Sequence, residues 1–136
     1  MSFVLDSSLS LSWCFDDERT DTADALLERV VEAGAVAPAL WPLEVLNALA
    51  MAERRSRIDA EQRQRLAGFV RDLPVTIDEE TASQAWAVTS QLAARFRLTV
   101  YDAAYLELAQ RRGLPLATLD QELRAAAAAL GVTLLD

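Results

Sequence analysis

The sequence contains no histidine and no lysine, and these two absences exclude several common catalytic arrangements. Without histidine, neither a Ser-His-Asp triad nor an imidazole acid–base pair can be assembled. Without lysine, there is neither a Schiff base nor a lysine-bearing phosphate loop. The four glycines are isolated from one another, so no glycine-rich loop is available to bind the phosphates of a nucleotide. If the protein is an enzyme, carboxylates have to supply the chemistry, and they favour oxygen-preferring cations such as Mg²⁺ or Mn²⁺.

Cysteine and long apolar runs are also scarce, which bears on the compartment of the protein. The single cysteine, Cys14, cannot form an internal disulfide and leaves zinc without a ligand set. No uninterrupted apolar run approaches the roughly 20 residues that span a bilayer. The N-terminus has no basic segment and its apolar stretch is broken at Asp6, so it does not resemble a signal peptide. We therefore expect a cytoplasmic protein without a membrane partner.

The length and the charge of the chain restrict the number of domains and the choice of partners. With 136 residues, the chain is expected to form one domain that spans residues 1–136. The net charge of −8 opposes non-specific binding to a polyanion such as RNA, since such binding usually depends on a basic surface. All 13 basic residues are arginines, however, and arginine can bind a phosphate with two parallel hydrogen bonds.

Short apolar runs alternate with segments of helical periodicity along the whole chain. The predicted strands comprise residues 2–5, 35–37, 75–77, 116–119 and 132–134. The predicted helices comprise residues 9–15, 23–33, 38–54, 59–73, 79–96, 99–112 and 120–130, with Asp78 expected to cap the helix that follows it. This alternation predicts an α/β fold with a central parallel β-sheet and helices on both faces. Ligands of such sheets bind at the carboxyl ends of the strands.

Three aspartates lie at the starts of predicted helices. Asp6 and Asp120 directly follow predicted strands, and Asp102 lies in the first turn of a helix. Each can be explained as an N-cap, whose carboxylate accepts the free amide hydrogens of the first helical turn. Convergence of all three at one sheet edge favours a further role, because neighbouring carboxylates repel one another unless a cation binds them. The two roles are compatible, since one oxygen can accept an amide hydrogen bond while the other binds a metal ion.

Glu44 is the most informative acid, because the predicted helix around it is apolar on nearly all sides. Such a helix is expected to be buried, and an ionised carboxylate buried without a partner costs several kcal/mol. A structural ion pair with an arginine, or a neutral hydrogen-bonded Glu44, would explain the residue without a metal. With three aspartates available, we favour one site in which Asp6, Glu44, Asp102 and Asp120 are the metal ligands and the catalytic residues.

Polar residues close to these acids in the sequence can assist such a site. Thr118 and Ser7 can orient a ligand or hold a metal-bound water, and Asn47 lies one helical turn after Glu44. Ordinary turn and capping hydroxyls explain Thr118 and Ser7 equally well, and they explain Ser8 better.

The aromatic residues have two interpretations. Tyr101 and Tyr105 can stack on a base, but core packing is the better explanation for each of them. The three tryptophans are expected to pack in the core or at an interface, and they are Trp13, Trp41 and Trp86.

Four blocks of this sequence resemble PIN domains and, more narrowly, the VapC toxins of bacterial type II toxin–antitoxin pairs. In chain order they are residues 3–8, 38–49, 99–109 and 114–126, so the resemblance spans nearly the whole chain. The acidic positions of the family fall on Asp6, Glu44, Asp102 and Asp120, and its accessory hydroxyl falls on Thr118. Many relatives carry lysine and more positive charge, which this sequence does not.

The resemblance implies a PIN-like α/β domain that acts as a Mg²⁺- or Mn²⁺-dependent endoribonuclease on RNA phosphodiester bonds. It also implies a homodimer and a VapB-type antitoxin whose tail covers the acidic site. One alternative is a non-catalytic RNA- or peptide-binding regulatory module that uses the same acidic pocket. A second is a metal-dependent phosphatase or a phosphate-accepting receiver domain, and the receiver version is weakened by the missing lysine.

Overall fold

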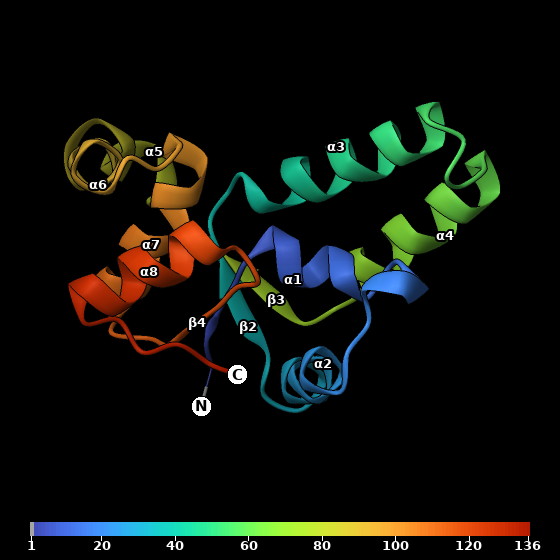
Figure 1. Cartoon of the computed structure of the whole chain (residues 1–136), viewed down its shortest axis with the longest axis horizontal. Helices are drawn as coiled ribbons and strands as arrows, with labels where there is room; N and C mark the ends of the chain where they lie inside the picture. The colour runs from blue at the N-terminus through green and yellow to red at the C-terminus, as the bar shows by residue number, and fades with distance from the viewer. Residues whose placement is uncertain (1) are drawn as a thin grey trace.

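The computed structural model describes residues 2–136, and its centre is a four-stranded parallel sheet. Strands β1 (Val4–Leu5), β2 (Ala35–Ala37), β3 (Val75–Ile77) and β4 (Leu116–Ala117) lie in the order β3-β2-β1-β4 (Figure 1). Every pairing in the sheet is parallel, which confirms the predicted fold class. The strand predicted at 132–134 is wrong: Leu134 forms only an isolated bridge with Leu116, because the short β4 offers it little to pair with.

Helices surround the sheet on both sides. In Figure 1, α7 and α8 lie to the left of the strands and α1 lies to the right, while α3 and α4 extend away as an antiparallel pair. The α-helices are α1 (Ser7–Ser12), α2 (Asp21–Ala33), α3 (Trp41–Arg54), α4 (Ala60–Arg71), α5 (Thr81–Gln84), α6 (Ser90–Phe96), α7 (Val100–Arg112) and α8 (Gln121–Leu130).

Helix ends follow local sequence signals in most places. Pro42 lies in the first turn of α3, where its missing N–H breaks no helical hydrogen bond. A capping box begins α4, since the side chains of Asp59 and Gln62 each accept from the other residue's backbone N–H. Gly113 and Gly131 end α7 and α8 with φ of +63° and +85°, a left-handed conformation that other residues adopt at a cost.

The single helix predicted over residues 79–96 is divided. A π-helical turn, Ala85–Thr89, separates α5 from α6. Asp78 does not cap α5, whose N-cap is Glu80 without a side-chain hydrogen bond. The reason is that Arg111 and Arg112 of α7 bind the carboxylate of the buried Asp78, at 2.7 and 2.9 Å, in an ion-pair cluster.

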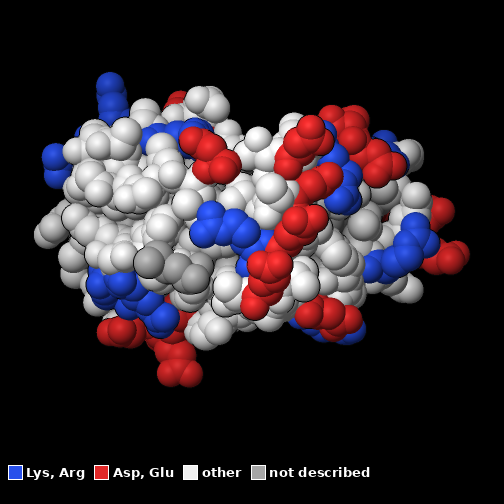
Figure 2. Space-filling view, turned by 90° about the horizontal axis from the view of Figure 1, so that it is seen from below, with Lys and Arg blue, Asp and Glu red and all other residues white. Residues whose placement is uncertain are grey.

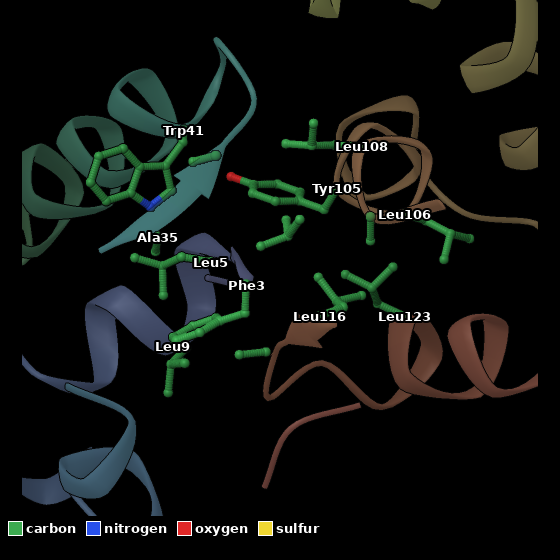
Figure 3. Packing of buried hydrophobic residues seen from close by; sticks show 14 of the residues in the cluster. Phe3, Leu5, Leu9, Ala35, Trp41, Tyr105, Leu106, Leu108, Leu116 and Leu123 are labelled. Atoms are coloured by element: carbon green, nitrogen blue, oxygen red, sulfur yellow. The ribbon is translucent and has the colours of Figure 1, made fainter. Parts of the chain in front are cut away.

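The hydrophobic core lies between the sheet and the helices on its two faces (Figure 3). Tyr105 is fully buried in it, as are Trp13 and Trp41, so core packing is confirmed for these aromatics. It is wrong for Tyr101, whose side chain is 63% exposed. Trp86 is 93% exposed and lies outside the core, while its other expected place, an interface, stays a prediction. Within residues 2–136, no helix combines the length and the apolar character needed to cross a membrane.

Candidate active site

The carboxyl ends of β1 and β4 bring Asp6 and Thr118 together. The two strands pair in parallel, with Leu5 opposite Ala117, so the residues that follow them leave the sheet at the same edge. The Thr118 hydroxyl donates a short hydrogen bond to Asp6 Oδ2, and both residues are almost completely buried. An acid and a hydroxyl that are 112 residues apart in sequence are therefore in direct contact.

Asp6 accepts four hydrogen bonds, which is the full capacity of a carboxylate. Oδ1 accepts from the Ser7 hydroxyl and from the backbone N–H of Ser8, both at 3.1 Å, and the latter bond makes Asp6 the N-cap of α1. Oδ2 accepts from the hydroxyls of Ser8, at 3.0 Å, and Thr118. Three of these donors are hydroxyls, which can rotate away from Asp6 and free a lone pair for a cation.

Glu44 faces this edge from the first turn of α3. Its Oε1 accepts from the Tyr105 hydroxyl at 2.6 Å and from the Ser7 hydroxyl at 3.3 Å. Burial raises the pKa of Glu44, as does the charge of Asp6, while the two hydrogen bonds act in the opposite direction. No arginine pairs with Glu44 in the part of the chain that the structure describes, so the explanation of Glu44 as half of a structural ion pair is wrong.

The helix that carries Glu44 is less buried than its sequence predicts. Leu43 is 70% exposed and Leu46 is 49% exposed, so the expectation of burial on all sides of α3 is wrong. The reason is that α3 packs on α1 and α4 and leaves another side open. Glu44 is consequently only half-buried, at a place where solvent and a ligand can reach it.

Asp102 and Asp120 complete the group of acids. Asp102 is not an N-cap, because Thr99 caps α7 by accepting from the Asp102 backbone N–H. Burial, followed by the negative charges of Asp6, Asp120 and Glu44, raises the pKa of Asp102 to about 6. Asp120 is the N-cap of α8, with Oδ1 accepting from the Leu123 backbone N–H at 2.8 Å.

The four acids thus lie within electrostatic range of one another at one edge of the sheet, without an arginine partner among residues 2–136. In that part of the chain, no three Asp, Glu or Cys side chains are already gathered closely enough to hold a metal ion. Mutual repulsion explains why carboxylates stay apart in the absence of a cation. Their donor atoms are all oxygens, the ligands that Mg²⁺ and Mn²⁺ prefer, whereas zinc sites usually include nitrogen or sulfur.

Glu44 and Asp120 each keep one carboxylate oxygen outside the hydrogen bonds found in residues 2–136. Glu44 uses Oε1 for both of its bonds, which leaves Oε2, and Asp120 uses Oδ1 for its cap, which leaves Oδ2. Asp120 can therefore cap a helix and bind a ligand at the same time: Oδ1 accepts from the Leu123 backbone N–H, and Oδ2 can bind a cation.

The accessory residues are placed unequally. Ser7 bridges Asp6 and Glu44, and Thr118 contacts Asp6 while accepting from the Asp120 backbone N–H at 3.1 Å. Asn47 is exposed on α3, one turn after Glu44, and takes part in none of the hydrogen bonds found within residues 2–136.

Sequence reasoning underestimated Ser8 and Tyr105. The Ser8 hydroxyl bonds Asp6, lies 3.3 Å from the Thr118 hydroxyl and accepts from the Leu119 backbone N–H, so it is more than a local capping group. Tyr105 was expected only in the core, yet its hydroxyl reaches Glu44. A signal existed for Tyr105, because it follows Asp102 by three residues and so shares its helix face.

Comparisons with known proteins show which sequences this chain is similar to. The sequence profile of the PIN domain matches residues 3–129. The chain is 31% identical to Ribonuclease VapC3 of Pyrobaculum aerophilum over 127 residues, which cover 90% of this chain and 92% of that protein.

Three solved structures share the fold, each at less than 25% sequence identity. PAE2754 of Pyrobaculum aerophilum has a TM-score of 0.68 at 24% identity, over 93% of this chain and 84% of that one. FitAcB of Neisseria gonorrhoeae has a TM-score of 0.68 at 15% identity, over 98% and 96%. Mycobacterium tuberculosis VapC20, described as a toxin that cleaves the sarcin–ricin loop, has a TM-score of 0.64 at 18% identity, over 92% and 95%.

Proposed function

Since the chain belongs to the PIN-domain family, among its VapC-type ribonucleases, we propose that it is a Mg²⁺-dependent endoribonuclease whose active site is formed by Asp6, Glu44, Asp102 and Asp120. Residues 1–136 would form a single catalytic domain. The observation that carries the proposal is the convergence of the acids at one sheet edge, where Ser7 bonds both Asp6 and Glu44 and the neighbouring acids, together with burial, raise the pKa of Asp102. Repulsion among these carboxylates is unfavourable in the free protein, and a bound divalent cation would offset it.

Bound Mg²⁺ would activate a water molecule and stabilise the charge on the phosphate oxygens during hydrolysis. Asp6 and Asp102 would be its principal protein ligands, and Mn²⁺ would fit the same oxygens. Glu44 Oε2 and Asp120 Oδ2 are the free oxygens that would complete the ligand set, directly or through water. Either of these two carboxylates can also accept the proton of the attacking water.

The hydroxyls around the site would orient the carboxylates. Tyr105 and Ser7 hold Oε1 of Glu44 and leave Oε2 available for a cation. Thr118 and Ser8 hold Asp6 while also contacting the loop that leads to Asp120. Such outer partners commonly contribute about 10- to 100-fold to metal affinity or activity.

A cleavage assay tests the proposal. A fluorescent single-stranded RNA would be incubated with the protein in Mg²⁺, after addition of a chelator, and after Mg²⁺ is restored. We expect cleavage that stops with the chelator, returns with Mg²⁺ and is absent from Asp6→Asn. Asp72→Asn is the matched control, because Asp72 is exposed and paired only with the neighbouring Arg71. Cleavage by Asp6→Asn, or in the presence of the chelator, would contradict the assignment.

The same experiment separates the enzyme from a non-catalytic docking module. A module that uses the acidic pocket only to bind RNA or a basic peptide would show binding without chelator-sensitive cleavage. Binding measured by fluorescence anisotropy on the same RNA, with Asp6→Asn beside the wild type, therefore distinguishes the two functions.

We also propose a homodimer and a VapB-type antitoxin that covers the acidic site, on the strength of membership in the VapC group. Mass measurement of the purified protein should give twice the 14.9 kDa of one chain. Co-expression with the product of the neighbouring reading frame should yield a complex in which RNA cleavage is suppressed. A monomer, or a neighbouring protein that neither binds nor inhibits, would contradict the corresponding proposal.

A further inference from the structure

Large apolar side chains are exposed beside three of the four acids. Leu43 precedes Glu44 and is 70% exposed, Tyr101 precedes Asp102 and is 63% exposed, and Leu119 precedes Asp120 and is 44% exposed. Val100, which is 50% exposed, adds to this set, and we call Leu43, Val100, Tyr101 and Leu119 the apolar rim. Water contact with such side chains is unfavourable, so an exposed apolar side chain next to one of the acids is available to a ligand with apolar faces.

Tyr101 is the only aromatic member of the apolar rim. The chain buries most of its aromatic rings elsewhere, as the core in Figure 3 illustrates with Phe3, Trp41 and Tyr105. Tyr101 lies in the first turn of α7, a helix whose following residues, 103–109, are all buried. Its backbone is therefore held rigidly, next to Asp102, while its ring remains accessible.

Charge limits how RNA can bind near these acids. The net charge is −8, and many of the arginines are engaged in ion pairs, including Arg19, Arg57, Arg63, Arg111 and Arg124. Figure 2 shows the side of the molecule opposite the acids, which carries α2 and the ends of the chain, and there too arginine and acidic side chains are interspersed. Counterion release by phosphate contacts is therefore a weak source of affinity, and contacts with the bases have to contribute more.

We propose that Tyr101 is a stacking platform for an unpaired nucleobase next to the scissile phosphate. The proposal rests on the function proposed above, since it places the phosphate at the four acids. Aromatic rings bind bases through their faces without selecting one sequence, and a base is free to stack on protein only where it is unpaired. Leu43, Val100 and Leu119 would contact the sugar and the neighbouring base.

Binding measurements on labelled RNA test this proposal in the Asp6→Asn background, which is expected to prevent cleavage. We expect Tyr101→Ala to weaken binding of a single-stranded oligonucleotide roughly 5- to 100-fold, the range that loss of one base–aromatic stack gives. Tyr101→Phe should retain the affinity, because the ring and not the hydroxyl stacks. The same RNA annealed to its complement should bind weakly to all variants. Phe69→Ala, which removes an exposed ring on α4, is the matched control.

A second RNA series makes the result specific to stacking. Oligonucleotides with one abasic site at successive positions should include one position at which the difference between wild type and Tyr101→Ala disappears. Equal affinity of wild type and Tyr101→Ala for the intact RNA would overturn the proposal and assign the apolar rim to a protein partner. An equal loss in Tyr101→Phe and Tyr101→Ala would also overturn it, in favour of a hydrogen bond from the hydroxyl.

Failure of the stacking proposal can be distinguished from failure of the proposed nuclease function. Absence of Mg²⁺-dependent cleavage by the wild type would remove the nuclease assignment, whereas the stacking platform is judged by affinity alone. Conversely, Mg²⁺-dependent cleavage by the wild type, together with equal RNA affinity of the Asp6→Asn protein with and without Tyr101→Ala, would support the nuclease assignment and contradict the stacking role of Tyr101.

Discussion

The Tyr105 hydroxyl donates a 2.6 Å hydrogen bond to Glu44 Oε1 and thereby joins α7 to α3 beside the acidic site. Figure 3 shows the Tyr105 ring reaching from α7 toward the start of α3, with the hydroxyl at the leading end. Asp102 lies on the same helix, three residues earlier. One helix therefore supplies an acid of the site and also orients a second acid that comes from another helix.

Replacing Tyr105 with phenylalanine should impair the site more than the fold. Tyr105→Phe keeps the buried ring and removes the hydrogen bond that favours the charged form of Glu44, so the pKa of Glu44 should rise further. We expect a Mg²⁺ requirement raised several-fold and a cleavage profile moved to higher pH, with a loss of only about 1 kcal/mol in unfolding free energy. Cleavage rates against Mg²⁺ and pH, together with urea denaturation, measure both effects. An unchanged Mg²⁺ requirement would show that Tyr105 serves the core alone.

The elements that sequence predicts well are those with local signals. Asp6 follows a buried apolar run and caps the next helix, and Asp59 and Gln62 cap each other three residues apart, so neighbouring residues determine these ends. The parallel sheet follows from alternation, and it places the ends of β1 and β4 at one edge. The convergence of Asp6 with Thr118 was therefore accessible to sequence reasoning.

Features that depend on contacts between residues distant in the sequence could not be predicted from local signals. Asp78 has the sequence context of a cap, but it is bound by Arg111, which lies 33 residues further along the chain. Tyr101 and Tyr105 are four residues apart and so share one face of α7, yet one is exposed and the other buried, because Tyr101 lies in the first turn, at the end of the helix. The exposure of Leu43 likewise depends on how α3 packs against its neighbours.

Replacing Asp102 with asparagine should remove activity and stabilise the metal-free protein. The pKa of Asp102 in the folded state, about 6, is above its ordinary value, so the folded state binds this proton more tightly than the unfolded chain. The stability that the proton provides is present at low pH and is lost as the pH rises through about 6. At pH 7, Asp102→Asn should therefore gain about 1 kcal/mol, after allowance for solvent screening of a half-exposed carboxylate.

Melting temperatures in a chelator between pH 4 and pH 8 would check this expectation. The difference between Asp102→Asn and wild type should grow with pH, while RNA cleavage by the variant falls by more than the roughly 10- to 100-fold that loss of an outer partner costs. A variant that is less stable than wild type at pH 7 would argue against repulsion among the acids.

Asp78 lies at the same sheet edge, after β3, and should behave in the opposite way. Burial would raise the pKa of Asp78, but hydrogen bonds from Arg111 and Arg112 lower it by more, and the carboxylate is 1% exposed. Asp78→Asn would leave Arg111 with fewer partners, so we expect a loss of about 3 kcal/mol in unfolding free energy. Because the folded pKa is depressed, the contribution of Asp78 is present above its ordinary pKa and disappears as the pH falls below about 4.

Urea denaturation at pH 7 and at pH 3 would measure the Asp78 effect. Asp72→Asn, which alters an exposed pair with Arg71, should change stability by less than about 0.5 kcal/mol and is the control. If Asp78→Asn and Asp72→Asn are equally stable, the ion-pair cluster around Arg111 contributes little to the fold.

Thr118 should act through its hydroxyl, which contacts Asp6 and accepts from the backbone N–H of Asp120. Thr118→Val keeps the volume and removes both hydrogen bonds, so we expect Mg²⁺ affinity to fall by roughly 10- to 100-fold. Thr118→Ser keeps the hydroxyl and should stay close to wild type. Calorimetric titration of Mg²⁺ into the three proteins would separate these outcomes, and a serine variant as impaired as the valine variant would assign the role to the Thr118 methyl group instead.

Mg²⁺ itself should stabilise the protein, because it would offset the repulsion that keeps the four acids apart. At a concentration of about 100 times its dissociation constant, a ligand of the folded state adds about 2.7 kcal/mol, which corresponds to a rise of about 10 °C in melting temperature for a chain of this size. The rise should be smaller at pH 5 than at pH 7.5, since Asp102, with a pKa of about 6, must lose its proton before it can bind the cation. Asp6→Asn should show no rise at either pH, and Asp72→Asn should behave as wild type. A rise of equal size in Asp6→Asn would place the cation elsewhere on this acidic protein.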